Sequence, residues 1–363
     1  MKKLDGKLGT REFVALLLLT ISLKVTDSTP TILLGKGENA SWMLPIISAS
    51  TILIPFLFLL SLLKKYKDKN IVEIGYSLTG NIFGFIIGMT LFLMMFVGTI
   101  ANSRSYVEII SPMFFTTTPV PFLYILLLFV GYFVANRGFE TIGRTAWLIV
   151  PYISVALALL VIFVWTDLDP IFLFPIAGPG LKELVLSGVK NTTIFGELIL
   201  IGVIYPFLRS YKTFKNGALL SLILTTITLS LFLAIYVMAF SFPPAKFIAF
   251  PFQNLTRMAQ VGEALEHSES IYLGFWVMAS TIHFAVYLYL AAALFAYTLK
   301  LKELEPLILP IAGLCFFVGM IPENYVETVF KFREGYFNIY SLIFFFLPIL
   351  LWSISRWKGR NSG

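Results

Sequence analysis

The sequence predicts an all-α, polytopic membrane protein. Of its 363 residues, 58% are apolar and only 13% are charged, and the mean hydropathy is +0.87. Soluble domains carry about 25% charged residues, so this chain has too few to cover a water-facing surface. The apolar residues also fall in long runs, and the basic residues between the runs are divided unevenly between the two sides of a membrane. These observations exclude a soluble enzyme, a disordered scaffold and a nucleic-acid-binding domain.

Ten apolar runs are bounded by polar clusters. A helix needs about 20 residues to cross the hydrocarbon core of a bilayer, and each run approaches or exceeds this length. The run at 306–321 is the shortest and fits a shorter or more upright helix. We therefore expect ten membrane-spanning helices at about 12–34, 42–63, 82–103, 119–136, 146–165, 193–210, 217–242, 271–299, 306–321 and 338–355.

The positive-inside rule orients this array of spans. If the N-terminus is inside, the inner segments hold 18 Lys and Arg residues and the outer segments hold 8, while Lys24 lies within a span. This division predicts a multi-pass membrane protein with both termini in the cytoplasm. It also explains the formal charge of +7 as an orientation signal, so we expect the lipid bilayer and no nucleic acid as a partner.

The ten spans divide into two groups of five within a single transmembrane domain, 1–363. The halves cover 11–165 and 193–357, and each opens with a span that carries charge inside the membrane. Because each half has an odd number of spans, the second half enters the membrane in the opposite direction, which is a recurrent transporter design. The outer loop 243–270 contains several apolar residues, and we expect a short interfacial or re-entrant helix there.

Charged residues inside the spans are candidates for function, because each costs about 2.5–3.5 kcal/mol at the centre of a membrane helix. Lys24 and Asp27 lie three residues apart in the first span, so they share one face of a continuous helix. Pro30 follows and removes a backbone donor. The polar segment 24–31 predicts either an unwound stretch that lines a binding cavity or a neutralised Lys–Asp pair that fixes helix packing. In the first case the ligand-binding side chains are Thr26, Asp27, Ser28 and Thr29.

Glu197, in the sixth span, is the third charge at membrane depth. It lies 12 residues before Arg209, or roughly 18 Å from the inner end of a helix that rises 1.5 Å per residue. Lys24 lies at a similar depth. Glu197 therefore either binds a ligand ammonium or a proton, or it pairs with Lys24 or lies at the membrane interface. All other charged residues can be assigned to loops or helix ends.

His283 lies in the middle of the predicted span 271–299, with Tyr287 one turn away. A lone histidine makes a poor metal site, so this one either lines a cavity or packs between helices. On the third span, Gly98 and Asn102 are one turn apart and could reach the same cavity. The sequence contains no Walker A motif, nucleophile elbow, zinc motif or haem motif, and we expect no catalytic residue, metal or cofactor.

Short motifs occur in a characteristic order along nearly the whole chain. They are Thr10-Arg-Glu-Phe13, Gly143-Arg144, Pro151-Tyr152, Phe195-Gly-Glu197, Arg209-Ser-Tyr-Lys212, Phe250-Pro251, Glu266-His-Ser-Glu269, Trp276, Pro322-Glu-Asn324 and Gly335-Tyr336. In this order the chain resembles the B subunits of bacterial spore germinant receptors. These are endospore germination permeases of the amino acid/polyamine/organocation superfamily.

The resemblance implies a leucine-transporter-like fold, with two inverted five-helix repeats, interrupted helices 1 and 6, and a ligand site near the midplane. It implies a small nutrient as ligand, an amino acid in many members. It also implies two partners in the spore inner membrane, the receptor's A subunit and its lipoprotein C subunit. Carried onto this chain, the site consists of Thr26–Thr29 with Phe195, Gly196 and Glu197, closed by Gly98–Asn102 and His283–Tyr287.

Lys24 and Asp27 depart from the apolar or small residues expected at those positions, and they could replace a coupling cation. Three functions are consistent with these features. The first is a germinant-sensing subunit that signals to its partners. The second is a proton-coupled amino-acid permease, in which Lys24, Asp27 and Glu197 couple protons or brace the site. A third is a conduit for water or ions. Sensing and transport would use the same cavity, so the residues alone leave all three open.

Overall fold

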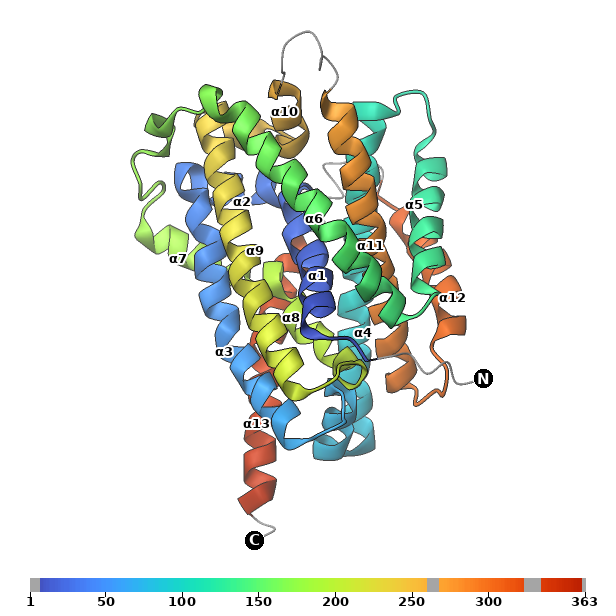
Figure 1. The fold of residues 1–363 in the computed structure, drawn as a ribbon. Coiled ribbons are helices and arrows are strands. Elements are labelled where there is room, and N and C mark those ends of the chain that lie inside the picture. The colour runs from blue at the N-terminus through green and yellow to red at the C-terminus, as the bar shows by residue number, and fades with distance from the viewer. Residues whose placement is uncertain (1–6, 260–267, 323–333, 361–363) are drawn as a thin grey trace.

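The predicted all-helical architecture is present in the computed structural model, which describes residues 7–259, 268–322 and 334–360. Within these ranges every regular element is a helix, and the β-type pairing is an isolated bridge between Leu8 and Leu208. Figure 1 shows most of the long helices side by side in one elongated bundle. Parts of two motifs quoted above, at 266–267 and 323–324, lie outside the described residues.

Long helices make up most of the bundle. The six longest are α3 (Leu44–Lys65), α4 (Ile71–Phe114), α6 (Phe139–Val164), α9 (Tyr211–Phe240), α11 (Ser268–Thr298) and α13 (Glu334–Arg360). The shorter α-helices are α1 (Thr10–Ile21), α2 (Thr29–Gly37), α5 (Val120–Ala135), α7 (Leu181–Lys190), α10 (Pro251–Met258) and α12 (Glu305–Gly319). The 3-10 helices outside the sixth predicted span are η1 (Ser22–Val25), η2 (Glu38–Met43), η3 (Trp165–Asp167), η4 (Pro170–Leu173) and η7 (Pro244–Phe247). The sixth predicted span consists of η5 (Thr192–Phe195), α8 (Glu197–Leu200) and η6 (Ile201–Phe207).

The described residues contain six helical stretches that are long and apolar enough to cross a membrane. Three shorter apolar segments accompany them, at Val120–Ala135, Glu197–Phe207 and Glu305–Gly319. The multi-pass architecture is therefore confirmed. The number ten stays a prediction, because the first and sixth predicted spans are broken into short pieces that length alone does not classify.

The third predicted span is longer than its hydropathy indicates. The sequence predicts 82–103, whereas α4 runs from Ile71 to Phe114. Asn70 begins the helix with a capping box, since its side chain accepts from the amides of Val72 and Glu73 while Glu73 bonds back to the Asn70 amide. At Gly80 the backbone turns to a φ of 82°, a conformation that glycine adopts without strain, so the helix changes direction there.

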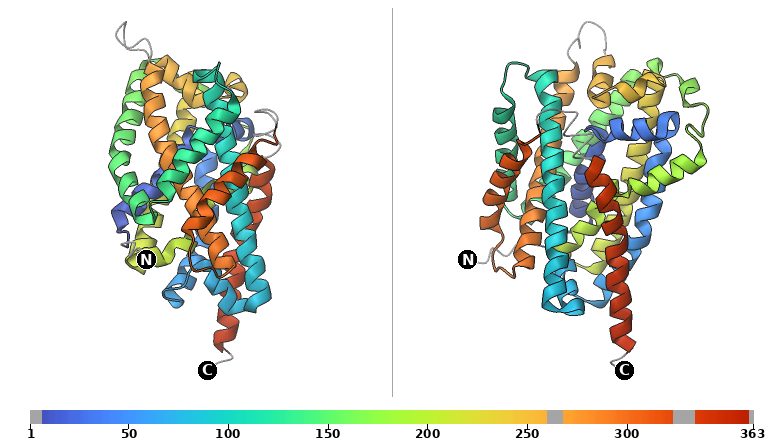
Figure 2. Two further views of the ribbon diagram at one scale, coloured as in Figure 1. Left: turned by 90° about the vertical axis from the view of Figure 1, so that its right-hand side faces the viewer. Right: turned by 180° about the vertical axis from the view of Figure 1, so that it is seen from behind.

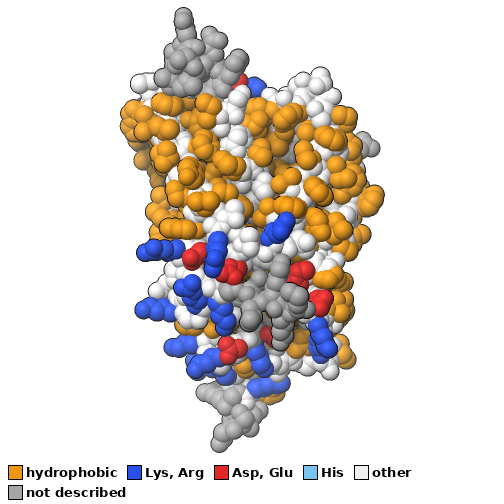
Figure 3. Space-filling view, turned by 45° about the vertical axis from the view of Figure 1, so that its right-hand side comes forward, with side chains coloured by type: hydrophobic (Ala, Val, Ile, Leu, Met, Phe, Trp, Pro, Cys, Tyr) orange, Lys and Arg blue, Asp and Glu red, His pale blue; other side chains and the backbone are white. Residues whose placement is uncertain are grey.

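One helix lies at the centre of the bundle and others lie at its edge. In α11, 83% of the most apolar window is buried inside the protein, against 17% in α6. Figure 3 shows a broad belt of hydrophobic side chains on the outer surface, with Lys and Arg side chains gathered below it. Such a continuous apolar belt is typical of a surface that faces lipid. Figure 2 shows that α13 extends beyond the other helices at its C-terminal end.

Candidate functional site

The first predicted span is interrupted inside the bundle. α1 ends at Ile21 and continues as η1 to Val25, and α2 begins only at Thr29. Pro30 lies in the first turn of α2, where a missing N–H is tolerated because helix starts leave that donor unpaired. The interruption therefore falls in the polar segment that predicts it. Residues 26–28 lie between the last 3-10 bond, from the Thr26 amide to the Leu23 carbonyl, and the first bond of α2, from the Ile32 amide to the Ser28 carbonyl.

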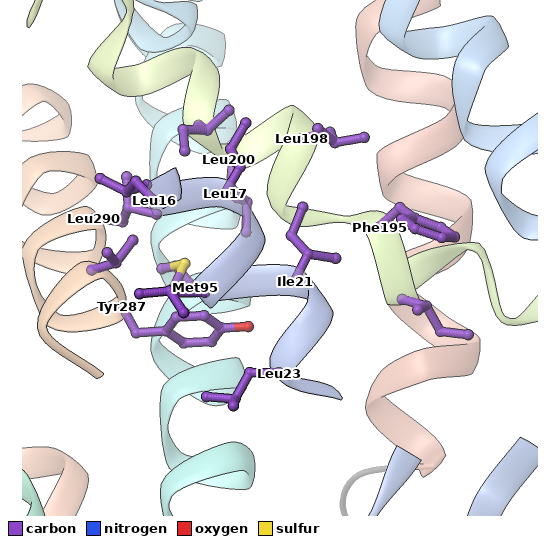
Figure 4. Packing of buried hydrophobic residues seen from close by; sticks show 14 of the residues in the cluster. Leu16, Leu17, Ile21, Leu23, Met95, Phe195, Leu198, Leu200, Tyr287 and Leu290 are labelled. Carbon is purple, nitrogen blue, oxygen red and sulfur yellow. The ribbon is translucent and has the colours of Figure 1, made fainter. Parts of the chain in front are cut away.

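The sixth predicted span holds a single turn of α-helix between two 3-10 segments. Gly196 joins η5 to α8 and packs against the ring of Phe344 on α13, where a Cβ atom would collide with the ring. Pro206 lies within η6 and lacks the backbone donor that a continuous α-helix needs. Figure 4 shows this segment beside α1, with the side chains of Leu200 and Leu17 next to each other in the apolar core.

A buried ion pair joins these two interrupted segments. Lys24 Nζ lies 2.7 Å from Glu197 Oε1 and 2.8 Å from Oε2, and it donates to the carbonyl of Ile194 at 2.5 Å. The two side chains are only 3% and 7% exposed. The hydroxyl of Tyr287, on α11, also donates to the Glu197 carboxylate. Buried charges need such partners, because an unpaired one loses its hydration without compensation. Glu197 therefore pairs with Lys24, which is one of the interpretations that the sequence allows.

The remaining predicted residues of α4 and α11 extend this cluster. Asn102 Nδ2 donates to the Tyr287 hydroxyl at 3.3 Å, and the ring of His283 stacks on that of Tyr287 with centroids 4.3 Å apart. All three side chains are buried. Gly98 is buried on α4 one turn before Asn102. His283 thus packs between aromatic rings, in line with its packing interpretation. Phe195 is also buried and belongs to the apolar core around the ion pair (Figure 4).

We call the first predicted span, α1–η1–α2, helix 1. Three other helices converge on its interruption. The carbonyl of Val25 accepts a hydrogen bond from the Tyr236 hydroxyl of α9 at 2.9 Å. The carbonyl of Thr26 accepts a hydrogen bond from Gln253 Nε2 of α10 at 3.1 Å. The side-chain oxygen of the same residue, Thr26 Oγ1, accepts one from Trp276 Nε1 of α11 at 2.7 Å. Protein side chains therefore already bond these polar groups. A ligand donor that takes the position of Gln253 or Trp276 on Thr26 would compete with that side chain for its hydrogen bond.

The end of the interruption is held in a similar way. Asp27 Oδ1 accepts from the amide of Thr29 at 2.6 Å, which places a carboxylate at the positive end of α2. Ser28 Oγ lies 2.8 Å from Ser105 Oγ on α4. Asp27, Ser28 and Thr29 are all buried. The structure thus brings the predicted residues of helix 1 into contact with α4 as well as with α9, α10 and α11.

A cavity of about 230 Å³ lies beside the interruption. Its walls come from α1, η1, α6, α9, α10 and α11, and none of the described residues that line it is charged. Its volume is below the roughly 300–1,000 Å³ of typical ligand pockets, so it fits a small molecule with a substantial apolar part. Thr26 is the one predicted ligand-binding residue that lines it. The polar side chains of its wall are Ser22, Thr26, Ser154, Thr228, Tyr272 and Trp276.

One prediction about charge placement is wrong. Arg104 and Glu108 lie inside α4 instead of in a loop or at a helix end, and Arg104 is only 4% exposed. Arg104 Nη2 lies 2.5 Å from Glu108 Oε1, one turn along the helix, and 3.3 Å from the carbonyl of Pro322. Charges that neutralise each other in this way can stay within a helix, so the drop in hydropathy after residue 103 does not mark its end.

Sequence reasoning also missed the residues that cover the interruption from the outer loop. The loop 243–270 contains the short helix α10, from which Gln253 reaches the carbonyl of Thr26. The local sequence does not reveal that this loop contacts helix 1, because the two segments are more than 200 residues apart. Trp276 offered a signal, because an indole N–H inside an apolar helix needs a hydrogen-bond acceptor.

Comparison with known proteins agrees with the order of motifs. Residues 13–328 match a family model described as spore germination protein. The chain belongs to the spore germination protein family. Spore germination protein KB of Bacillus subtilis (strain 168) is 23% identical over 270 residues, which are 71% of each chain. Spore germination protein YndE of the same organism is 24% identical over 356 residues, covering 95% of this chain and 93% of that protein.

The resemblance to germination permeases is thereby confirmed. Membership of the spore germination protein family, together with the multi-pass fold, indicates a non-enzymatic membrane protein with a germinant-receptor or permease role. Its many apolar helices agree with the membrane location that this role requires.

Solved structures of a manganese transporter have a similar fold. A mutant of the manganese transporter of Eremococcus coleocola matches with a TM-score of 0.59 at 13% identity, covering 94% of this chain and 76% of that chain. The same transporter in complex with an aromatic bis-isothiourea substituted compound matches with a TM-score of 0.56 at 10% identity. At these identities the likeness concerns the fold alone. The chain therefore has the leucine-transporter-like fold of these transporter structures.

Proposed function

We propose that this chain is the germinant-sensing subunit of a spore germination receptor. In this proposal it binds a small nutrient, and the favoured nutrient is an amino acid. The observation that carries the proposal is the interruption of helix 1 beside a cavity of about 230 Å³, in a member of the spore germination protein family. Interrupted helices near the midplane are where transporters of this architecture bind their substrates. The cavity would hold the apolar part of the nutrient.

The proposal includes the architecture that the sequence predicts. The single transmembrane domain comprises two inverted five-helix repeats, 11–165 and 193–357, with both termini in the cytoplasm. The basic side chains gathered below the apolar belt in Figure 3 support this orientation, because Lys and Arg concentrate on the cytoplasmic side of membranes. The location is the spore inner membrane.

In the proposed site, the polar groups of the nutrient bind at Thr26–Thr29. The remaining residues of the site are Gly98, Asn102, Phe195, Gly196, Glu197, His283 and Tyr287. Their contribution is structural. The Lys24–Glu197 ion pair holds the two interrupted segments together, and the Tyr287 hydrogen bond ties Glu197 to α11. The pair braces a neighbouring cavity that is itself lined by uncharged residues.

Signalling requires that the nutrient binds two states of the protein with different affinity. Gln253 supplies a structural basis for that difference, since it ties α10 to the Thr26 carbonyl. A nutrient that takes over this carbonyl releases α10 from helix 1. The A subunit and the lipoprotein C subunit of the receptor would detect the resulting shift.

Gln253→Ala is therefore expected to bind the nutrient more tightly, up to roughly tenfold, because the nutrient no longer competes with a hydrogen bond of ordinary strength. Asn254→Ala is the matched control, since that side-chain amide donates locally, to the carbonyl of Phe250 just before α10, at 2.8 Å. Equilibrium binding to the purified protein measures both. Equal affinities in the two variants would rule out competition between the nutrient and Gln253.

Spores test the function as a whole. Deletion of this protein is expected to abolish germination in response to at least one nutrient, and restoring the gene is expected to bring the response back. Spores that lack the protein and still germinate normally with every nutrient in a panel of amino acids, sugars and nucleosides would overturn the proposal.

A proton-coupled amino-acid permease is the second candidate, and the buried Lys24–Glu197 pair favours it. Ionisable residues at membrane depth are typical of proton pathways. Liposomes that contain the protein and carry an imposed pH gradient should then accumulate a bound amino acid. Binding without accumulation would leave sensing as the function.

A further inference from the structure

A second cavity lies at the end of the bundle where α3 ends and α9 begins. Its volume is about 370 Å³, and it is lined by four basic side chains and one carboxylate, which leaves a net charge of +3. The charged side chains are all exposed, whereas Tyr205 and Leu208 form a buried floor. We call it the basic pocket, and its charged residues are Lys7, Lys64, Lys67, Asp68 and Arg209.

Three segments that are distant in sequence build the basic pocket. They are the residues before α1, the last turn of α3 with the turn that follows it, and the junction of η6 with α9. The first and third are held together by their backbones, because the Leu8 amide donates to Phe207 O at 3.0 Å and the Arg209 amide donates to Leu8 O at 3.1 Å. Arg209 Nε also donates to Lys7 O at 3.0 Å. The cations therefore surround a defined hollow.

We propose that the basic pocket binds the phosphate group of an anionic phospholipid. A concave surface with an excess of positive charge attracts an anion more strongly than the same charges spread over a flat surface. Basic pockets between membrane helices are suited to phospholipid headgroups. The single carboxylate, Asp68, leaves the excess positive, and Arg209 can pair with phosphate through its guanidinium.

The helices on either side of the pocket favour a lipid over a free phosphate ion. α3 and α9 pack against each other (Figure 1), and both expose apolar side chains beyond the pocket. Leu57 is 51% exposed and lies roughly 10 Å along α3 from Lys64, at 1.5 Å per residue. Leu220 and Ile223 are exposed on α9. Acyl chains attached to the bound phosphate can therefore lie along apolar helix surfaces.

Binding in the basic pocket also affects the two interrupted segments. The pocket exists while Leu8 remains bridged to the end of η6, so a bound lipid stabilises the bridged state relative to one in which the segments separate. The amides of Leu8 and Arg209 should then exchange their hydrogens more slowly when the lipid is present.

The test compares the full-length protein in nanodiscs of phosphatidylglycerol and of phosphatidylcholine. The pocket variant carries Lys7→Gln, Lys64→Gln and Lys67→Gln, and the control carries Lys212→Gln, Lys215→Gln and Lys302→Gln, which removes equal charge from exposed residues at the same end. Native mass spectrometry measures retained phosphatidylglycerol. Loss of three cations is expected to weaken retention roughly a hundredfold in the pocket variant. The control variant should behave as wild type.

Three other outcomes would count against the proposal. Equal loss in both variants would mean that general surface charge attracts the lipid. Full retention in the pocket variant would mean that the lipid binds elsewhere. Inorganic phosphate, added to the protein in phosphatidylcholine, is the third arm. Phosphate is expected to slow hydrogen exchange of the Leu8 and Arg209 amides less than phosphatidylglycerol does. If the two slow it equally, the pocket binds a soluble phosphate and the lipid assignment is wrong.

Discussion

Glu197→Gln is expected to lower the free energy of unfolding by about 3–5 kcal/mol, because it leaves Lys24 as an unpaired charge inside the bundle. Both side chains are almost fully buried, and the carboxylate holds Lys24 Nζ through both of its oxygens. The substitution preserves the size of the side chain, so the loss reports the charge. Tyr287 also loses the carboxylate to which its hydroxyl donates. Chemical unfolding of the purified protein in mixed micelles measures the change.

Two further variants make this result specific. Glu140→Gln breaks the pair with Arg144, whose side chain is 70% exposed, so it is expected to change stability by at most about 1 kcal/mol. The double variant Lys24→Met, Glu197→Met removes both buried charges and is expected to recover most of the stability. If Glu197→Gln proves as stable as Glu140→Gln, the ion pair does not brace the interrupted segments.

The class of fold was predictable because hydropathy is a property of the local sequence. A membrane excludes most charge, so the few charged residues left inside the spans stand out. The rise of a helix then places Lys24 and Glu197 at the same depth, and the structure pairs them. The interruption of helix 1 was predictable for the same reason, because a polar segment followed by Pro30 is a local signal.

The limits of helix α4 were not predictable from hydropathy. Arg104 and Glu108 lower the local hydropathy, yet they neutralise each other one turn apart and the helix continues to Phe114. Whether a charged residue ends a span or is paired within it depends on its partner. Here Arg104 also donates a hydrogen bond to the carbonyl of Pro322, which lies more than 200 residues later in the chain.

The cavity and its cover depend on tertiary packing, which no local pattern encodes. Gln253 reaches Thr26 from an outer loop, and Tyr236 and Trp276 reach the same interruption from two other helices. These contacts arise only when the bundle assembles. The sequence therefore identifies the segment at which helix 1 opens, whereas the structure identifies the space beside it.

The cavity beside helix 1 is central to the proposed function. A substitution at Thr228 can fill this cavity without changing any residue of the interruption. Thr228 lines the cavity from α9, and Thr226 lies two residues earlier on the same helix without lining it. Both are half-buried, and each hydroxyl donates to the carbonyl four residues before it. Thr228→Phe fills the cavity with a larger side chain, and Thr226→Phe is its matched control.

The most direct test is the change in Tm that a nutrient produces in these proteins. A panel of amino acids, sugars and nucleosides first identifies the nutrient that raises the Tm of the wild type, as ligands that bind only the folded state must. The same nutrient is expected to raise the Tm of Thr226→Phe by a similar amount and to leave that of Thr228→Phe unchanged. An equal increase in all three proteins would show that the nutrient binds outside the cavity beside Thr26.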